Sequence, residues 1–161
     1  MAGRYPGPVF LDATVVSNFA STDGIGFLTT VLESSVVVPA VRKEIEGGAR
    51  SEYEYLGVAV DALSESLPVR EVPSEADDSD IRDRLGADEA ESIPGVLAHG
   101  GTVATDDLAA RRVAENREIP VTGSIGLLVL GVECGTVPAK LLTTGSIRGG
   151  NAEGTTRRSK A

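Results

Sequence analysis

Residues 102–122 read TVATDDLAARRVAENREIPVT, a β-branched run, a helical stretch and a second short β-branched run. The run over 102–105 predicts a buried strand that ends at Asp106 and Asp107. Residues 108–118 then predict a helix, and residues 119–122 predict another strand. A strand, a helix and a strand in this order are typical of a parallel sheet that is covered by helices.

The same alternation extends over the rest of the chain. Residues 9–11 and 35–38 predict two further buried strands, which end at Asp12 and Pro39. Helices are expected over residues 13–30 (broken near 23–24), 39–46 (ended by glycines 47 and 48), 51–64, 87–99 and 123–134, and a short extended piece over 69–72. These elements predict a three-layer α/β/α fold with a parallel sheet, in a single domain over residues 1–147. A disordered tail rich in Gly, Thr and Arg is expected over 148–161.

The composition excludes several classes of protein. The chain has 161 residues, of which 41% are apolar and 24% charged, as in a globular domain. No apolar run approaches the roughly 20 residues of a membrane span, and the start has no signal pattern, so we expect a cytoplasmic location and no membrane association. The single cysteine, Cys134, excludes an internal disulfide and thiolate zinc clusters, and the single histidine, His99, excludes sites that need two imidazoles.

The charge balance is strongly acidic, with a formal net charge of −9. A broad basic groove for nucleic acid is therefore not expected. Only 3 of the 15 basic residues are lysines, and aromatic residues make up 4% of the chain, a composition that resembles proteins of salt-loving archaea. In molar salt the Debye length is about 3 Å, so repulsion among surface acids is screened. An ordinary acidic protein is the alternative interpretation.

Four acids are predicted to lie at one edge of the sheet. Asp12 and Asp107 follow strands directly. Glu44 lies in the second turn of the helix after the second strand, and Glu89 lies in the first turn of its helix. Because ligands of parallel α/β folds bind outside the carboxyl ends of the strands, these acids should face one site.

The spacing between Glu89 and Asp107 supports this convergence. The two acids are 18 residues apart. About ten helical residues advance ~15 Å, the glycine pair at 100–101 reverses the chain, and about five strand residues return ~16 Å. The two distances nearly cancel, so both acids should reach the same edge.

Four clustered carboxylates point to a bound cation. Like charges repel, so they stay ionised at neutral pH only when cations neutralise them. Oxygen ligands without His or Cys favour Mg²⁺ or Mn²⁺, which can activate water for attack on a phosphodiester. The pattern predicts a metal-dependent phosphoesterase or nuclease. Taken alone, Glu89 has an alternative role with the dipole at its helix N-terminus, and Asp12 has one as an N-cap.

Six short motifs carry a resemblance to a known family. They are FLDAT at 10–14, VPAVRKE at 38–44, DEAESI at 88–93, TDD at 105–107, ARRVA at 110–114 and VTGSIG at 121–126. In this order and spacing they resemble the PIN-domain family, especially its VapC-like archaeal branch. The resemblance covers most of residues 9–133 and implies a metal-dependent endoribonuclease.

The resemblance assigns the family's acids to this chain. Its four acids fall on Asp12, Glu44, Glu89 and Asp107, with Asp106 as the alternate for the fourth position. These residues are the expected catalytic acids and the expected ligands of Mg²⁺ or Mn²⁺. The expected partners are RNA, an antitoxin protein that inserts a segment into the acidic pocket, and a second copy of the chain in a homodimer. The toxin of a toxin–antitoxin pair is one form of this function.

Three further residues match the family's pattern near these acids. Thr14 matches a small hydroxyl residue beside the first acid. Arg111 matches an arginine one turn after the acid pair, where it either pairs with Asp107 or faces a phosphate. Ser124 either lines the pocket or, like Thr122, caps the helix that follows.

The chain also departs from the family's pattern. Pro94 and Gly95 are expected to interrupt the helix that carries Glu89, Asp88 replaces the usual glycine, and the segment after Gly135 does not match. These departures motivate an alternative function, a catalytically weak PIN module that binds nucleic acid or a protein partner.

Two other folds with acidic pockets fit less well. A phosphoacceptor receiver domain has its acid pair after the first strand, whereas Asp12 stands alone there. A haloacid-dehalogenase-type phosphatase needs a second aspartate where this chain has Thr14.

The remaining polar residues are given structural roles. We expect His99 to cap the end of its helix, Cys134 to pack in the core, and Glu91 to face solvent or to support one of the acids. The acid-rich run over 71–91 is expected to be a solvated helix or loop, and Arg157-Arg158 to belong to a solubilising end.

Overall fold

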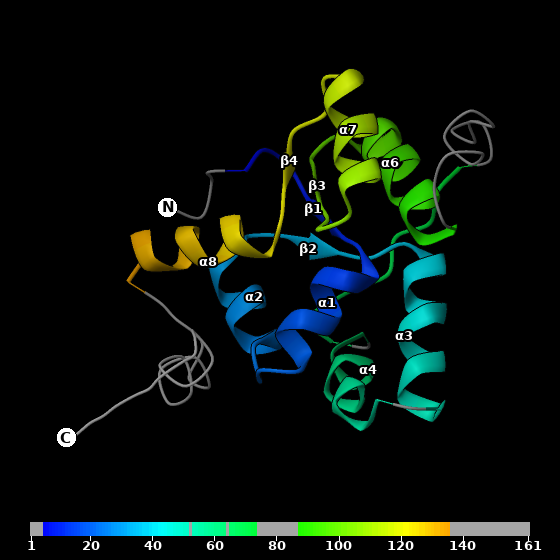
Figure 1. Cartoon of the computed structure of the whole chain (residues 1–161), viewed down its shortest axis with the longest axis vertical. Helices are drawn as coiled ribbons and strands as arrows, with labels where there is room; N and C mark the ends of the chain where they lie inside the picture. Colours follow the sequence, from blue (N-terminus) through cyan, green and yellow to red (C-terminus); the bar gives the residue numbers. More distant parts are fainter. Residues whose placement is uncertain (1–4, 52, 64, 74–86, 136–161) are drawn as a thin grey trace.

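A parallel sheet forms the centre of the computed structural model, which describes residues 5–51, 53–63, 65–73 and 87–135, with the backbone alone for 87–90. Its strands are short and lie in the order β2-β1-β3-β4 (Figure 1). They are β1 (Val9–Leu11), β2 (Ser35–Val36), β3 (Thr102–Ala104) and β4 (Val121–Thr122). All three pairings are parallel, as the alternation of strands and helices predicts.

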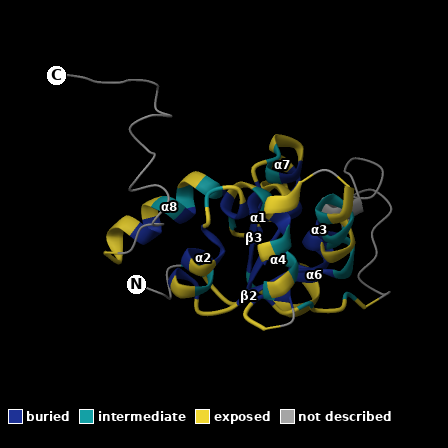
Figure 2. Cartoon of the chain, turned by 90° about the horizontal axis from the view of Figure 1, so that it is seen from below, coloured by how far each residue is buried: buried dark blue, intermediate teal, exposed yellow. Residues whose placement is uncertain are grey.

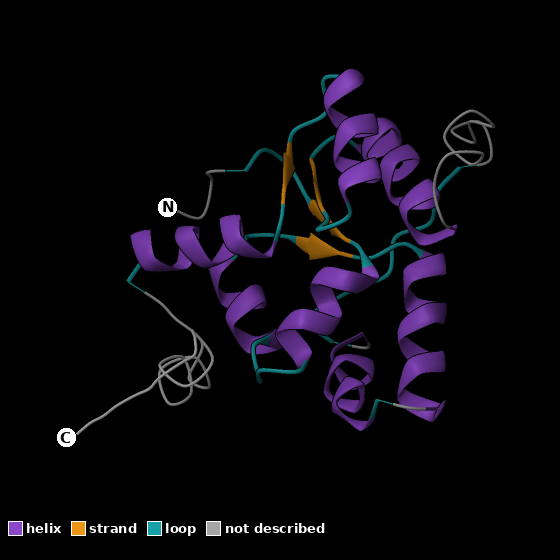
Figure 3. Cartoon of the chain, viewed as in Figure 1, coloured by secondary structure: helices purple, strands orange, loops and turns teal. Residues whose placement is uncertain are grey.

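Helices cover both faces of the sheet (Figures 1 and 3). α6 (Ala87–His99) and α7 (Leu108–Asn116) pack on one face. α1 (Ala13–Ala20), α2 (Ile25–Val31) and α8 (Ser124–Glu133) pack on the other. α3 (Pro39–Ser51) contacts both α1 and α6, and η1 (Glu54–Leu56) and α4 (Gly57–Leu63) pack against α3. The three-layer α/β/α fold is therefore confirmed.

The register between the two central strands positions the site. Leu11 lies opposite Ala104, so Asp12 comes out beside Thr105 at the carboxyl edge of the sheet. The Asp12 backbone N–H donates to the Ala104 carbonyl at 3.0 Å, which extends the ladder by one residue. The strands are buried between helices whose outer faces are exposed (Figure 2). A central strand covered on both sides explains why β1 consists of apolar residues alone.

Two predicted helix boundaries are wrong, because packing overrides local preference. α3 continues through Gly47 and Gly48 to Ser51. A side chain at Gly48 would place its Cβ 2.7 Å from Leu56 Cδ1, so this glycine lets η1 pack close to the helix. The stretch over 51–64 is divided into η1 and α4 instead of one helix.

The expected interruption of α6 at Pro94 is also wrong. The helix is continuous over Ala87–His99 with Pro94 inside it. Gly95, the next residue, lies so close to the sheet that a Cβ would meet Phe10 Cε2 at 3.0 Å and Val38 Cγ1 at 3.2 Å. The glycine therefore serves close helix–sheet packing, and that packing offsets the backbone hydrogen bond that a proline cannot donate.

Other local predictions have mixed outcomes. The break between α1 and α2 is present, with Asp23 at a φ of 58°. Val69 makes an isolated parallel bridge to Val37, which fits the extended piece expected there. Cys134 is exposed rather than buried, because it is the C-cap residue of α8 and lies beyond the helix's packed turns.

Some predictions fall outside the described residues. The tail over 148–161, with Arg157-Arg158, lies there, as does most of the acid-rich run. In the parts of the chain that are described, no helix is long and apolar enough to cross a membrane.

Candidate functional site

The carboxylate of Asp12 is fully buried, with 0% of the residue exposed, at the end of β1. Thr14 Oγ1 donates to its Oδ1 at 2.7 Å, and the Val15 backbone N–H donates to the same oxygen at 3.1 Å. Its other oxygen, Oδ2, accepts from Thr105 Oγ1. A buried charge needs such donors. Asp12 is therefore the N-cap of α1, as one interpretation of the sequence holds, and Thr14 lies beside it as expected.

Thr105 links the ends of the two central strands. Its hydroxyl donates to Asp12 Oδ2 and accepts the Asp107 backbone N–H at 3.1 Å. Asp12 and Thr105 are 93 residues apart in sequence. Thr105 is a functional residue that is not among those predicted above, although it directly precedes the acid pair in the sequence.

The two acids after β3 have different partners. Asp107 is the N-cap of α7, and its Oδ2 accepts from the Ala110 N–H at 2.8 Å. Asp106 instead reaches the opposite layer of helices. Its Oδ1 accepts from the Ser124 N–H at 2.8 Å, and its Oδ2 accepts from Ser124 Oγ at 2.5 Å and from Asn18 Nδ2 at 2.9 Å.

Asp106 also takes over the capping of α8. The N-cap residue of that helix is Gly123, which has no side-chain cap, so the expected N-cap role of Ser124 or Thr122 is wrong. The first N–H of the helix is satisfied by Asp106 instead. A Cβ at Gly123 would lie 2.6 Å from Asp106 Oδ1 and 2.9 Å from Arg111 Nη1, so only glycine leaves room for this approach.

Arg111 lies against the end of β3. Its Nη1 donates to the Thr105 carbonyl at 3.1 Å. Within the described residues this hydrogen bond, rather than an ion pair with Asp107, holds the guanidinium. The expected pairing with Asp107 is therefore wrong, because the side chain folds back toward the strand instead of along α7. Its half-buried position keeps a positive charge beside the acids.

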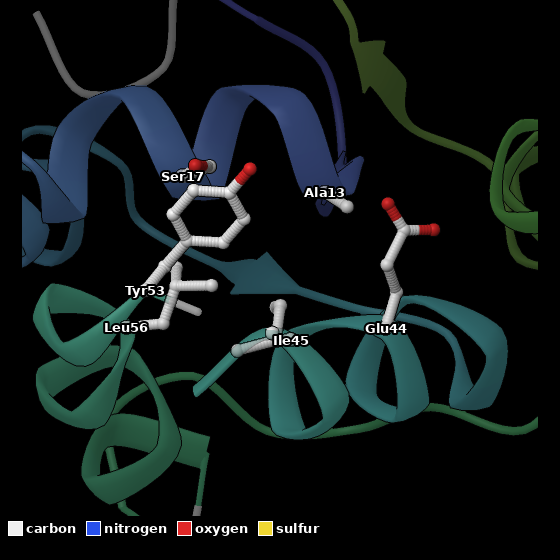
Figure 4. A pocket seen from close by; sticks show the side chains of 7 residues that line it. Ala13, Ser17, Glu44, Ile45, Tyr53 and Leu56 are labelled. Carbon is white, nitrogen blue, oxygen red and sulfur yellow. The ribbon is translucent and has the colours of Figure 1, made fainter. Parts of the chain in front are cut away.

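Glu44 projects from α3 toward the start of α1 (Figure 4). It lines a pocket of about 130 Å³ together with Ala13, the residue directly after Asp12. Ser17, Ile45, Gly48, Tyr53 and Leu56 complete the lining. Glu44 therefore lies near the start of α1, the helix that Asp12 caps.

Glu89 lies in the first turn of α6, and its side chain is outside the described part of the chain. Among the side chains that are described, no three from His, Cys, Asp and Glu are grouped closely enough to hold a metal ion. The described geometry joins Asp12 to Asp107 through Thr105, and it places Glu44 beyond Ala13.

The profile of a protein family, described as DUF3368: PIN domain, matches residues 8–143. The chain belongs to this PIN-domain family. PIN domains have a nuclease-like fold, are typically nucleases and generally bind divalent metals.

A solved structure supports the same fold for this PIN domain. PAE2754 from Pyrobaculum aerophilum aligns with a TM-score of 0.57 and 14% sequence identity, over 78% of this chain and 90% of that one. At this identity the likeness concerns the fold alone. The comparison with curated proteins finds no match.

Glu91 is a further residue of this PIN domain whose role the sequence left open. Its Oε1 accepts the Ala40 backbone N–H at 2.7 Å, at the N-terminus of α3. The side chain is half-buried and thereby joins α6 to α3. These are the helices that carry Glu89 and Glu44, two of the four predicted acids, so Glu91 sets how the helices of these two acids approach each other.

His99 lies away from these acids. Its ring stacks on Phe10 with centroids 6.1 Å apart, and its Nε2 lies 2.9 Å from the Glu71 carbonyl oxygen. It ends α6, and its contacts lie with Phe10 of β1 and with Glu71 at the start of the acid-rich run.

Proposed function

We propose that this PIN domain is an Mg²⁺- or Mn²⁺-dependent endoribonuclease that hydrolyses RNA phosphodiester bonds. The observation that carries the proposal is the buried Asp12 carboxylate, which Thr105 joins to the acid pair at the carboxyl edge of β1 and β3. A fully buried, hydrogen-bonded carboxylate at this edge of a parallel sheet is costly to maintain for stability alone. Ligands of such folds bind at this edge.

The donor set fits a hard divalent cation. The four acids Asp12, Glu44, Glu89 and Asp107 offer carboxylate oxygens alone, the ligands that Mg²⁺ and Mn²⁺ prefer. When bound, the cation would supply a lowered pKa for water and charge neutralisation at the phosphate. Membership of a family that generally binds divalent metals supports the same assignment.

The chain's own residues would orient the acids and the substrate. Thr14 and Thr105 each donate to one oxygen of Asp12, so the orientation of this carboxylate is fixed before any ligand binds. The cap that Asp107 makes on α7 fixes its Oδ2. The guanidinium of Arg111 donates to the Thr105 carbonyl and so lies at the same edge. Its positive charge would neutralise part of the charge of a bound phosphate.

A second candidate function is a catalytically weak PIN module that binds nucleic acid or a protein partner. Its main motive in the sequence is the interruption expected at Pro94. The continuous α6 removes this motive, since Pro94 does not end the helix that carries Glu89.

RNA cleavage by the purified chain tests the proposal. We expect cleavage with Mn²⁺, no cleavage with EDTA, and a loss of at least about 100-fold in Asp12→Asn, because one oriented charge at a phosphoryl-transfer centre contributes several kcal/mol. Glu115→Gln, which removes an exposed acid on α7, is the matched control and should cleave normally. Low and molar salt should both be used.

The opposite result would support the binding module. If the folded protein fails to cleave RNA under every condition and binds no Mn²⁺ by calorimetry, the nuclease assignment is wrong.

The toxin role, the antitoxin and the homodimer are finer parts of the proposal. Co-purification of a small protein with this chain tests the antitoxin and the toxin role. The molecular mass measured in solution tests the homodimer.

A further inference from the structure

We infer that the pocket beside Glu44 is a nucleobase subsite, in which one base of a single-stranded RNA stacks on the ring of Tyr53. The inference rests on the proposed function, because it concerns how an RNA strand would be held next to the acids. It adds a binding site on η1 and α3 that lies outside the acid cluster.

The lining of the pocket suits a flat, neutral and largely apolar group. Its apolar part comes from Ala13, Ile45, Gly48 and Leu56. Its polar part comes from Ser17, Glu44 and Tyr53, and none of the described residues that line it is basic. Ligand sites combine mostly apolar side chains with a few polar groups, as this lining does. A phosphate would find no positive charge there, whereas a base would find both surface and hydrogen-bonding groups.

The tyrosines are the exposed aromatic side chains at this site. The three phenylalanines, Phe10, Phe19 and Phe27, are all buried. Tyr53 is 47% exposed and Tyr55 is 37% exposed, and their rings lie 5.6 Å apart at a tilt of 48°. An accessible ring face is the platform on which unpaired bases stack in single-strand binding proteins.

The tyrosine pair is braced against the layer that carries Asp12. The hydroxyls of Tyr55 and Ser17 lie 3.3 Å apart, which links η1 to α1. The ring of Tyr53 packs against that of Tyr55. Figure 4 shows the Tyr53 ring beside Ser17, on the wall of the pocket. A ring that is already held in place loses less entropy when a base stacks on it.

The pocket is continuous with the candidate acid site. Glu44 lines one end of it and points to the start of α1, while Tyr53 lies at the other end (Figure 4). Glu44 and Gly48, one turn apart on α3, are separated by about 6 Å along the helix axis. This is less than two stacked nucleotide steps of about 3.4 Å each. A base on Tyr53 would therefore belong to a nucleotide close to the phosphodiester at the acids.

Binding of a labelled oligouridylate in EDTA tests the inference without cleavage. We expect Tyr53→Ala to raise the Kd roughly tenfold or more, the effect of losing one stacked base, and Tyr53→Phe to keep the affinity within about twofold. An oligomer of the same length with abasic positions should bind wild type and Tyr53→Ala equally, because it keeps the phosphates and lacks the bases. The ratio between variants should persist in molar salt.

A pair of glycine variants on α3 provides a matched control for the shape of the pocket. A Cβ at Gly48 would lie 2.7 Å from Leu56 Cδ1 and 3.7 Å from Tyr53 Cδ2, so Gly48→Ala pushes Leu56 aside and alters the floor. A Cβ at Gly47 would have no neighbour within 4 Å. Both changes improve helix propensity equally. Gly48→Ala should weaken oligouridylate binding severalfold, and Gly47→Ala should not.

The outcomes separate this inference from the nuclease assignment. Tyr53-dependent binding without any cleavage supports the subsite and contradicts the nuclease. Cleavage that depends on Asp12 but keeps its KM in Tyr53→Ala supports the nuclease and overturns the subsite. Absence of oligouridylate binding by wild type also overturns it. So does equal weakening of the abasic oligomer by Tyr53→Ala. The pocket would then be assigned to a side chain of a protein partner.

Discussion

At the scale of single residues, the two adjacent acids after β3 divide two tasks. Asp106 receives three donors from α1 and α8, so its carboxylate is committed to holding the two helices together. Asp107 caps α7 with one oxygen and lies one hydrogen bond from Thr105. The contacts thus favour Asp107 as the fourth acid of the proposed nuclease, with Asp106 as a positioning residue.

Asparagine variants of the two acids test this division. Asn is as good an N-cap as Asp, so Asp107→Asn should keep the stability of α7 while cleavage falls by about 100-fold or more. Asp106→Asn places an amide N–H₂ group, which is a donor, against the donors of Asn18 and Ser124. Because one of these donors then loses its acceptor, the variant should lose about 1–3 kcal/mol of unfolding free energy. Urea unfolding and RNA cleavage measure the two effects. A stable Asp106→Asn without activity would instead assign the fourth position to Asp106.

At the scale of elements, a side chain from one helix caps another. The Ala40 N–H, at the N-terminus of α3, is satisfied by Glu91 from α6. A carboxylate at a helix N-terminus is also favoured by the helix dipole. This contact sets how α3 and α6 approach each other, and these two helices carry Glu44 and Glu89.

Replacing Glu91 should therefore affect stability and activity together. Glu91→Ala should cost about 0.5–2 kcal/mol, the usual range for a lost cap, and should lower kcat as the two acids lose their relative placement. Glu91→Gln keeps an acceptor oxygen at the same place, and it should recover most of the stability and activity. Chemical denaturation and cleavage kinetics measure both. If Glu91→Ala loses stability but keeps kcat, Glu91 has no role in placing the acids.

At the scale of the whole molecule, net charge is the dominant electrostatic feature. A chain of 161 residues with a net charge of −9 repels itself when folded. The described acids at the sheet edge add to this repulsion locally. Salt shortens the range of repulsion, to about 10 Å at 0.1 M and about 3 Å at 1 M.

We expect the melting temperature to rise from low to molar KCl. A gain of about 1 kcal/mol corresponds to roughly 2–4 °C for a chain of this size. Thermal unfolding followed by circular dichroism measures the shift. Sulfate at equal ionic strength is the control, since it also strengthens burial by exclusion from the surface. A melting temperature that does not change with KCl would contradict the salt-adapted interpretation of the composition.

Short-range pattern in the sequence was sufficient for the fold class and for most element positions. Short apolar and β-branched runs predicted all four strands of the described sheet, and the turn at 23–24 predicted the division between α1 and α2. The acids at the strand ends predicted that the candidate site lies at the carboxyl edge of the sheet, because parallel strands present their carboxyl ends together. These features depend on residues that are close in sequence, so local sequence patterns predict them.

Only the tertiary structure decided the features that depend on contacts between distant segments. Packing of Gly95 on Phe10 keeps α6 continuous through Pro94, although proline and glycine are both poor helix formers. The bond between Asp12 and Thr105 spans 93 residues. The different partners of Asp106 and Asp107, the cap from Glu91 and the pocket at Tyr53 likewise arise where separate elements meet. Local preferences of about 1 kcal/mol per residue do not encode such contacts, because burial and hydrogen bonding across the core outweigh them.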